Sequence, residues 1–149
     1  MKQTLTWILS ACIPALAAAG DLPLSQGKPA KASSVWGVGF EAGMANDGND
    51  ESRWGAAPDA RSGWLEIDLG VPLLVSRAVV KELGFHRTQQ FAIEYRDGES
   101  WKPLVTGTKI AGERTFAFPP VKAQCFRLNI LKASEVPTIE EFQLYGPGK

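Results

Sequence analysis

The sequence predicts an all-β protein, a single antiparallel β-sandwich, and three observations support this fold class. Apolar and polar residues alternate with a period of two in several short segments. Turn signals recur at roughly the 8 to 12 residue spacing of all-β sandwiches and barrels. No window of a dozen residues carries a helical stripe of apolar side chains. The chain of 149 residues is long enough for one domain with a hydrophobic core, and it contains no internal repeat.

Residues 1–19 have the organisation of a secretory signal peptide. Met1-Lys2 is a short basic start, residues 5–16 form an apolar run, and Ala17-Ala18-Ala19 offers a small-residue cleavage site. Pro14 and the shortness of the run argue against a spanning helix, which needs about 20 apolar residues. No other stretch is apolar enough to cross a bilayer, so we expect an exported protein without a transmembrane segment.

A second reading of this segment stays open. Residues 9–12, Leu-Ser-Ala-Cys, resemble a bacterial lipobox, in which Cys12 would be lipidated and anchor the protein. Because the apolar run continues past Cys12, cleavage near Ala19 is the favoured reading. The expected location is then secreted, periplasmic or on the cell surface. A short leader over 20–27 and one domain over 28–147 follow.

Charge and cysteine content exclude some classes of function. The chain has 16 basic and 16 acidic side chains, and Lys2 is the only charged residue of the predicted signal peptide, so the mature protein carries one excess acid. That balance does not suit a nucleic-acid surface. Cys125 is the only cysteine of the cleaved form, so we expect no internal disulfide in an exported protein.

The first third of the mature chain is predicted to consist mainly of loops. Residues 29–34 are expected to form an edge strand. Residues 35–44 contain three glycines and follow neither period, so they predict a long loop, which carries Trp36 and Phe40. A second loop, rich in glycine, alanine and proline, covers 55–63.

Between these loops lies a polar segment, 45–54, which reads Ala-Asn-Asp-Gly-Asn-Asp-Glu-Ser-Arg-Trp. It predicts a tight turn, because Gly48 adopts positive φ freely and the flanking Asp and Asn side chains bond their own backbone. The segment is too polar for the core, and Trp54 marks the return to an apolar environment. It is either a solvated turn or a cation site.

Strands dominate the rest of the chain. Residues 64–69 alternate, with leucine and isoleucine on one face, and 75–83 is a β-branched run typical of a buried strand. Residues 91–95 alternate again before Asp97-Gly98, a hairpin signal, and 101–105 follow at hairpin distance. We expect Trp54, Trp64 and Trp101 in the core or at its margin.

Three further strands complete the prediction. Residues 114–118 are expected to end at Pro119-Pro120, which an interior ladder would not accept. Residues 125–131 alternate cleanly, and 139–145 close the domain. Cys125 lies in an alternating strand, so we expect an inert, covered thiol.

In order and spacing, these segments resemble the discoidin domain, also called the coagulation factor V/VIII type C domain, a galactose-binding-like β-sandwich of jelly-roll topology. The resembling segments cover almost all of the mature chain: Ala32–Ser34, Asp47–Asn49, Ser52–Trp54, Trp64–Gly70, Phe91–Tyr95, Asp97-Gly98 before Trp101, Phe126–Leu128 and Ile139–Tyr145.

Within that family the chain is similar to bacterial carbohydrate-binding modules of family 32 and to the domain that follows the catalytic domain of some α-L-fucosidases. Residues 81–87 and 106–112 carry the second similarity. The resemblance implies a non-catalytic, exported glycan-binding module for galactose- or fucose-type sugars, working alone or with a separate glycoside hydrolase.

A structural calcium ion is the cofactor that we expect. Calcium takes about six to eight oxygen ligands, and Asp47, Ser52 and the turn carbonyls can supply several, although the spacing excludes an EF-hand. The resemblance adds the last strand and implies a ligand set of side chains from Asp47, Ser52 and Glu141 and carbonyls from Met44, Asn49 and Glu140. Such a clip would join a loop near the start of the chain to a strand near its end. The alternative is a solvated turn beside a surface carboxylate.

Sugar recognition needs an aromatic face for the C–H side of the ring and a few fixed polar groups for its hydroxyls. Trp36, His86 and Arg87 are the first candidates, with Arg53 and Phe40 behind them. Each has a structural alternative: Trp36 as a cap on the core, and His86 as an ordinary surface residue. For the arginines the alternative is a structural ion pair, of Arg87 with Glu82 and of Arg127 with Asp68.

Catalysis finds little support in the sequence. A cysteine–histidine nucleophile pair would need Cys125 and His86, which are expected on a strand and in a distant loop. Glu66 and Asp68 share one face of a sheet and do not form opposite walls of a cleft. The chain is therefore predicted not to be an enzyme.

Two non-catalytic alternatives to glycan binding remain. The first is a protein- or membrane-adhesion module of the discoidin type, which would use Trp36 and Phe40 at a loop tip. Binding to anionic lipid calls for a basic rim, whereas residues 35–52 carry only acids. The second is a purely structural accessory domain of a larger assembly.

Overall fold

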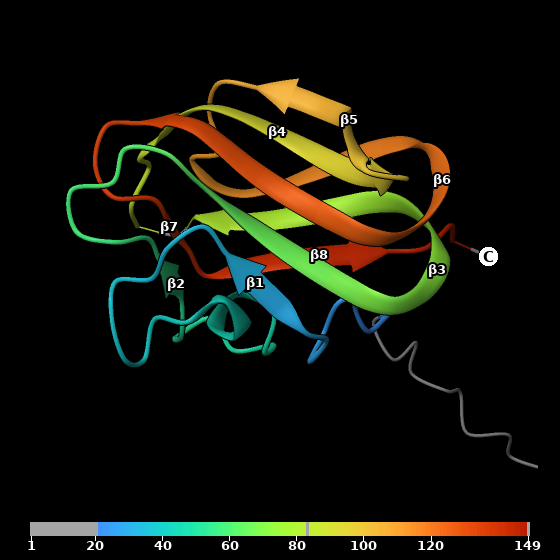
Figure 1. The fold of residues 1–149 in the computed structure, drawn as a ribbon, viewed down its shortest axis with the longest axis horizontal. Coiled ribbons are helices and arrows are strands. Elements are labelled where there is room, and N and C mark those ends of the chain that lie inside the picture. Colours follow the sequence, from blue (N-terminus) through green and yellow to red (C-terminus); the bar gives the residue numbers. More distant parts are fainter. Residues whose placement is uncertain (1–20, 83, 149) are drawn as a thin grey trace, which may run out of the picture.

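The computed structural model describes residues 21–82 and 84–148, and shows two layers of antiparallel strands (Figure 1). The predicted signal peptide and the Cys12 anchor lie outside the described residues. One short 3-10 helix accompanies the strands, and no helix among the described residues is long and apolar enough to cross a membrane. The elements are β1 (Ala30–Ala32), η1 (Ala42–Ala45), β2 (Trp54–Gly55), β3 (Gly63–Glu82), β4 (Thr88–Asp97), β5 (Ser100–Gly107), β6 (Gly112–Ala133), β7 (Thr138–Ile139) and β8 (Glu141–Tyr145).

Strands β3 and β6 are long, and each contributes to both layers. Residues 63–68 of β3 pair with 125–130 of β6 in one layer, which continues through β4 to β5 and has β1 at its other edge. Residues 73–82 of β3 pair with 112–123 of β6 in the other layer, where β8 lies on the opposite side of β3. The β-sandwich prediction is therefore confirmed.

The prediction of separate strands at 64–69 and 75–83 was wrong, because both belong to β3. Its register is interrupted between Asp68 and Leu73, where Gly70 has a φ of 86° and donates its amide to Asp68 Oδ1 at 2.8 Å. The chain bends there and resumes pairing with the same partner strand in the other layer.

The prediction that Pro119-Pro120 ends a strand was wrong for a similar reason. The two prolines lie in β6 at an irregularity, where Ala117 pairs with Arg77 and Val121 pairs with Val75. Residues without an amide proton are accepted at such a bulge, because no ladder hydrogen bond is required of them. The predicted strands 114–118 and 125–131 are thus the two ends of β6.

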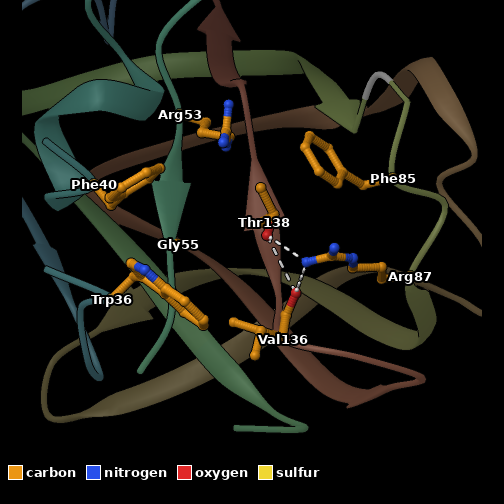
Figure 2. Close-up of a pocket in the computed structure, with 8 residues that line it drawn as sticks. All are labelled: Trp36, Phe40, Arg53, Gly55, Phe85, Arg87, Val136 and Thr138. Atoms are coloured by element: carbon orange, nitrogen blue, oxygen red, sulfur yellow. Dashed lines mark hydrogen bonds between the residues drawn. The ribbon is translucent and has the colours of Figure 1, made fainter. Parts of the chain in front are cut away.

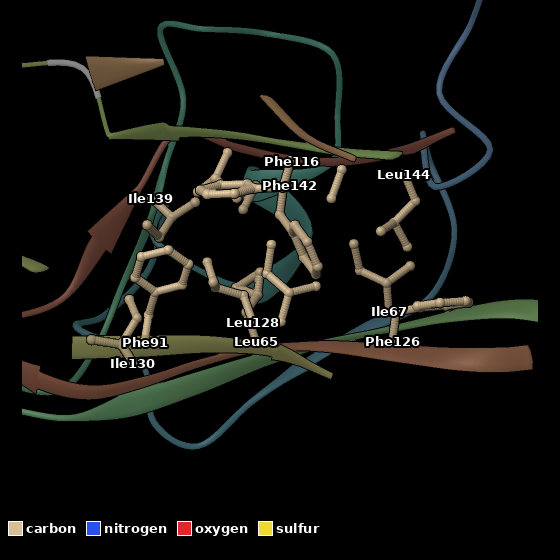
Figure 3. Close-up of a cluster of buried hydrophobic side chains, with 14 of the residues drawn as sticks. Leu65, Ile67, Phe91, Phe116, Phe126, Leu128, Ile130, Ile139, Phe142 and Leu144 are labelled. Atoms are coloured by element: carbon tan, nitrogen blue, oxygen red, sulfur yellow. The ribbon is translucent and has the colours of Figure 1, made fainter. Parts of the chain in front are cut away.

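The core lies between the two layers (Figure 3). Its largest side chains are almost wholly removed from solvent, including Phe91, Phe126, Phe142 and Trp54. Trp54 is in the core as predicted, whereas Trp64 and Trp101 are half-buried at its margin.

Cys125 also meets its prediction. Its side chain is buried, and burial, reinforced by the charges of Asp68 and Glu66, raises the pKa of the thiol. A thiol whose pKa is raised is a poor nucleophile at neutral pH.

The expected last strand, 139–145, changes partner at Glu140. Thr138 and Ile139 pair with β2, whereas Glu141 to Tyr145 pair with β3. The Glu140 amide donates to the Lys81 carbonyl at 2.9 Å between the two ladders. This switch brings Glu141 to the polar turn.

The first described residues pack beside β8. The Leu24 amide donates to the Leu144 carbonyl at 2.7 Å, and the Leu144 amide donates to Ser25 Oγ at 2.9 Å. Ser25 is fully buried. The two ends of the described chain therefore lie together, at the opposite end of the molecule from β2 and β7 (Figure 1).

Candidate functional site

A cavity of about 230 Å³ opens at the β2–β7 end of the sandwich (Figure 2). Four segments build it: the loop after β1, the β2 strand with the residue before it, the β3–β4 loop, and β7 with the residues before it. Its lining consists of Trp36, Phe40, Arg53, Gly55, Phe85, Arg87, Val136 and Thr138. Four of the five predicted ligand-binding residues thus meet in one place.

Backbone hydrogen bonds to Gly55 hold the aromatic loop. The Trp36 amide donates to the Gly55 carbonyl at 2.7 Å, and the Gly55 amide donates to the Phe40 carbonyl at 3.2 Å. A Cβ at Gly55 would lie 3.4 Å from the Cβ of Trp36 and 3.8 Å from the Cβ of Phe40, so both aromatic residues pack closely over this glycine. Trp36 is 50% exposed, whereas Trp54 is fully buried, so the core contains the indole of Trp54 and not that of Trp36.

Arg87 forms a fixed polar wall. Its Nη1 donates to the Val136 carbonyl at 3.0 Å and to Thr138 Oγ1 at 3.1 Å, and its Nε lies 3.1 Å from a carboxylate oxygen of Glu135 (Figure 2). The alternative of a side-chain pair with Glu82 is not observed, because the Arg87 guanidinium pairs with Glu135. The buried Glu82 carboxylate instead accepts the Arg87 backbone amide at 2.8 Å.

Glu82 orders the segment that carries Arg87. One of its carboxylate oxygens also accepts from the Thr88 amide at 2.8 Å and from the Thr88 hydroxyl at 3.0 Å. A buried carboxylate with several N–H and O–H donors is well satisfied without a cationic partner. Glu82 therefore fixes where β4 begins and where the Arg87 side chain starts.

Arg53 lies between two aromatic rings. Its guanidinium carbon is 5.1 Å from the ring centroid of Phe40 and 5.2 Å from that of Phe85, both within the range of cation–π attraction. Phe85 also contacts Arg87, whose guanidinium carbon lies 4.8 Å from the same ring.

His86 is exposed and is not part of the cavity lining. Its φ of 46° places it in the left-handed region between Phe85 and Arg87, which both line the cavity. Phe85, Val136 and Thr138 line the cavity but were not predicted as site residues. The only signal for Phe85 was its position beside two candidate residues in one loop.

The polar turn brings oxygen atoms together around Ser52. The Ser52 hydroxyl lies 2.5 Å from Asp47 Oδ2, 2.9 Å from the Asn49 carbonyl and 3.3 Å from the Met44 carbonyl. Asp47 Oδ1 accepts the Asn49 amide at 3.0 Å, and Gly48 has the predicted positive φ, 77°. These are the oxygen types that calcium prefers.

Glu141 completes this group from β8. Its Oε1 accepts the Gly48 amide at 3.1 Å, and its residue is 1% exposed. Burial, followed by the hydrogen bond with Asp47 and the negative charge of Asp47, raises the pKa of Glu141 to about 7. Asp47 and Glu141 are two carboxyl groups in contact, and Glu141 is buried. A cation bound between them would lower the free-energy cost of ionising both groups.

The donor set of this turn fits a cation held mainly by carbonyl and hydroxyl oxygens. Among the described residues no cluster contains three or more histidine, cysteine, aspartate or glutamate side chains placed to hold a metal. Asp47 and Glu141 are the two carboxylates of the predicted ligand set. Asp50 is already paired, 3.0 Å from the Lys81 ammonium. The predicted Glu140 carbonyl ligand stays a prediction.

The alternative of an ion pair between Arg127 and Asp68 is not observed either. Arg127 pairs with Glu94 at 2.9 Å, whereas Asp68 accepts hydrogen bonds from the Gln124 amide group at 2.9 Å and from Gly70. The Gln124 and Gly70 hydrogen bonds lower the pKa of Asp68. A carboxylate that stays ionised on a sheet face has no feature of a general acid.

Comparisons with known proteins agree with this architecture. The family model for the F5/8 type C domain matches residues 29–142. Comparison with curated protein sequences yields no significant match. Among solved structures, chitosan-binding module 1 of a chitosanase/glucanase from Paenibacillus sp. IK-5 is 27% identical with a TM-score of 0.77, over 83% of this chain and 98% of that one.

Two further structures are informative. A GH29 fucosidase of Ruminococcus gnavus in complex with fucose is 26% identical with a TM-score of 0.77, over 85% of this chain and only 27% of the fucosidase. The family 32 carbohydrate-binding module of C. perfringens NanJ, in complex with galactose, shares the fold at 20% identity and a TM-score of 0.71, over 83% of this chain and 96% of that one.

Proposed function

Because this chain belongs to the F5/8 type C domain family, we propose that it is a non-catalytic carbohydrate-binding module whose ligand occupies the cavity beside Trp36. The observation that carries the proposal is the half-exposed Trp36 indole held opposite fixed polar donors. The similarity to modules described as chitosan-binding, or solved with galactose, supports it.

The cavity has the composition that a sugar requires. Trp36 and Phe40 offer apolar faces, and Arg87 and Thr138 offer hydrogen-bonding groups on the opposite wall (Figure 2). Its volume of about 230 Å³ is below the range of about 300–1,000 Å³ typical of drug-sized ligands, so a single monosaccharide unit fits best. We propose galactose- or fucose-type units.

A glycan array probed with the full-length protein tests this function. We expect binding to terminal galactose- or fucose-type glycans. The Trp36→Ala variant should bind them at least about tenfold more weakly, because the substitution removes the aromatic surface on which the sugar ring stacks. Trp101→Ala is the matched control, since it deletes an indole outside the cavity. The proposal would be contradicted if the protein bound no glycan on the array, or if both variants lost glycan binding equally.

We further propose that calcium binds at the Asp47 turn and has a structural role. The convergence of oxygens around Ser52 and the approach of Glu141 support it. The melting temperature should be higher in calcium than in chelator, and Asp47→Ala should abolish that difference. Asp50→Ala, in the same turn but paired with Lys81, should retain it. A wild type insensitive to calcium would refute this proposal.

We propose that the protein is exported, because residues 1–19 have the organisation of a signal peptide. Cleavage after Ala19 would yield a mature protein that starts at Gly20, whereas lipidation would leave Cys12 as its first residue. The mass of the protein recovered from the cell envelope separates these outcomes. Full-length protein retained in the cytoplasm would contradict both. A separate glycoside hydrolase as partner is proposed from the fucosidase similarity alone.

A second candidate function is membrane adhesion, which one observation favours. Val38 is 96% exposed at the tip of the loop that carries Trp36. An exposed apolar loop tip can insert into a membrane interface. Co-sedimentation with phosphatidylserine vesicles, reduced by Val38→Asp, would support this candidate, and no co-sedimentation would exclude it.

A further inference from the structure

The cavity beside Trp36 is positively charged. Among the residues that the structure describes, the charged side chains that line it are those of Arg53 and Arg87, whereas Asp59 and Glu135 line an adjoining hollow that shares Trp36 and Arg87 with it. The surroundings of the two arginines are largely apolar, because Trp36, Phe40 and Phe85 form much of the wall. Electrostatic interactions are stronger beside such low-dielectric walls than in open water.

The two arginines differ in how far their hydrogen-bonding groups are used. Arg87 already donates to Val136 and Thr138 and pairs with Glu135, whose side chain is 65% exposed outside the cavity lining. Arg87 is therefore mainly a fixed wall. Glu135 offsets its charge from the solvent side.

Within the described part of the chain, Arg53 is held by ring contacts and not by such partners. Among residues 21–82 and 84–148, the contacts found for its guanidinium are the two aromatic rings, with no hydrogen bond or ion pair. Rings that pack against a guanidinium position it while leaving its N–H groups available to an acceptor. The planar N–H fork of arginine matches a carboxylate or sulfate, which accept two parallel hydrogen bonds.

From this geometry we propose that the preferred ligand is an acidic saccharide unit, one that bears a carboxylate or a sulfate ester, with its anionic group on Arg53 and its ring on Trp36. The inference rests on the proposed glycan-binding function and narrows its ligand class. A cationic amino sugar would face the guanidinium groups of Arg53 and Arg87, of which only that of Arg87 is offset by Glu135, so chitosan should bind poorly even though similar modules are described as chitosan-binding.

Affinity electrophoresis of the full-length protein tests the ligand class. The gels contain one of four polysaccharides: polygalacturonate for the carboxylate, fucoidan for the sulfate ester, neutral galactan, or chitosan. We expect retardation by polygalacturonate, fucoidan or both, at least about tenfold weaker binding to galactan, and none to chitosan. Comparison of the two acidic polymers shows whether the protein binds the carboxylate or the sulfate ester.

Arginine variants give the second readout. Arg53→Gln should weaken binding to the acidic polymer at least about tenfold and reduce its salt dependence, because it removes the charge that pairs with the anion. Arg96→Gln is the matched control, since Arg96 also packs on an aromatic ring, 5.1 Å from the centroid of Trp101, but outside the cavity. Equal loss in the two variants would overturn the proposal.

The outcomes separate this inference from the function on which it rests. Two outcomes would refute the acidic ligand while leaving the glycan-binding function intact. One is Trp36-dependent binding to galactan that is as strong as binding to the acidic polymers, and the other is binding to chitosan. No retardation by any polysaccharide would refute both. Binding only to phosphatidylserine vesicles would assign the anion site to a membrane and also refute the inference.

Discussion

Glu141→Gln should remove most of the pH dependence of folding stability in the presence of chelator. The folded protein raises the pKa of Glu141 from the usual 4.5 to about 7. Between these values the folded state keeps a proton that the unfolded state releases, so the free energy of unfolding falls as the pH rises from 4.5 to 7. Below pH 4.5 the carboxyl is protonated in both states, and above pH 7 the contribution is lost.

The size of this effect follows from the shift. At about 1.4 kcal/mol for each pKa unit, the full shift corresponds to roughly 3 kcal/mol. We reduce this to about 2 kcal/mol, because Asp47 on one side of the pair is exposed and solvent screens its charge. Calcium should reverse the trend by favouring both ionised carboxylates, so the stabilisation that it provides should be greater at pH 8 than at pH 5.

Urea unfolding followed by tryptophan fluorescence at pH 5 and pH 8 measures the difference. The wild type in chelator should lose about 2 kcal/mol between the two values relative to Glu141→Gln. Glu99→Gln, on an exposed turn, is the matched control and should behave as the wild type. The reasoning would be refuted if Glu141→Gln showed the same decrease in unfolding free energy between pH 5 and pH 8 as the wild type. It would also be refuted if the stability of the wild type in chelator rose with pH.

Three further variants test buried hydrogen bonds and packing in the domain. Glu82→Ala should cost about 3 kcal/mol of unfolding free energy, because the Thr88 amide and hydroxyl lose a buried acceptor, and the same urea titration measures it. Gly107→Ala should cost about 1–3 kcal/mol in that assay, since its Cβ would lie 2.8 Å from the buried ring of Phe91; an unchanged midpoint would argue against this contact. Phe126→Ala, at a fully buried position, should cost about 3–5 kcal/mol and lower the midpoint most.

Much of the fold could be predicted because a half-buried strand shows its period in the sequence. The hairpin between β4 and β5 was predicted from Asp97-Gly98, and Gly98 has the expected positive φ, 63°. Single strands that serve both layers could not be predicted. Gly70 and Pro119-Pro120 signal a strand end, and only tertiary pairing shows that the same two strands continue beyond the bend.

The candidate site could be predicted in part for a different reason. Trp36 and Arg87 stand out in loops, where large aromatic and charged side chains are not needed for the core. Val136 and Thr138 carry no such signal, because small side chains in a connection are common whatever their role. Their place in the cavity depends on the β2–β7 pairing, which joins segments more than 80 residues apart.

The contact between Leu24 and Leu144 also determines how the domain can be attached to other proteins. Since both ends of the described chain leave from the side opposite β2 and β7, a neighbouring module joined at either end, or at both, would not obstruct the cavity. Two neighbouring ends of this kind are compatible with insertion of the domain into a loop of another protein. The same proximity makes it suitable for circular permutation, with a short linker joining the ends and new termini at the β4–β5 turn.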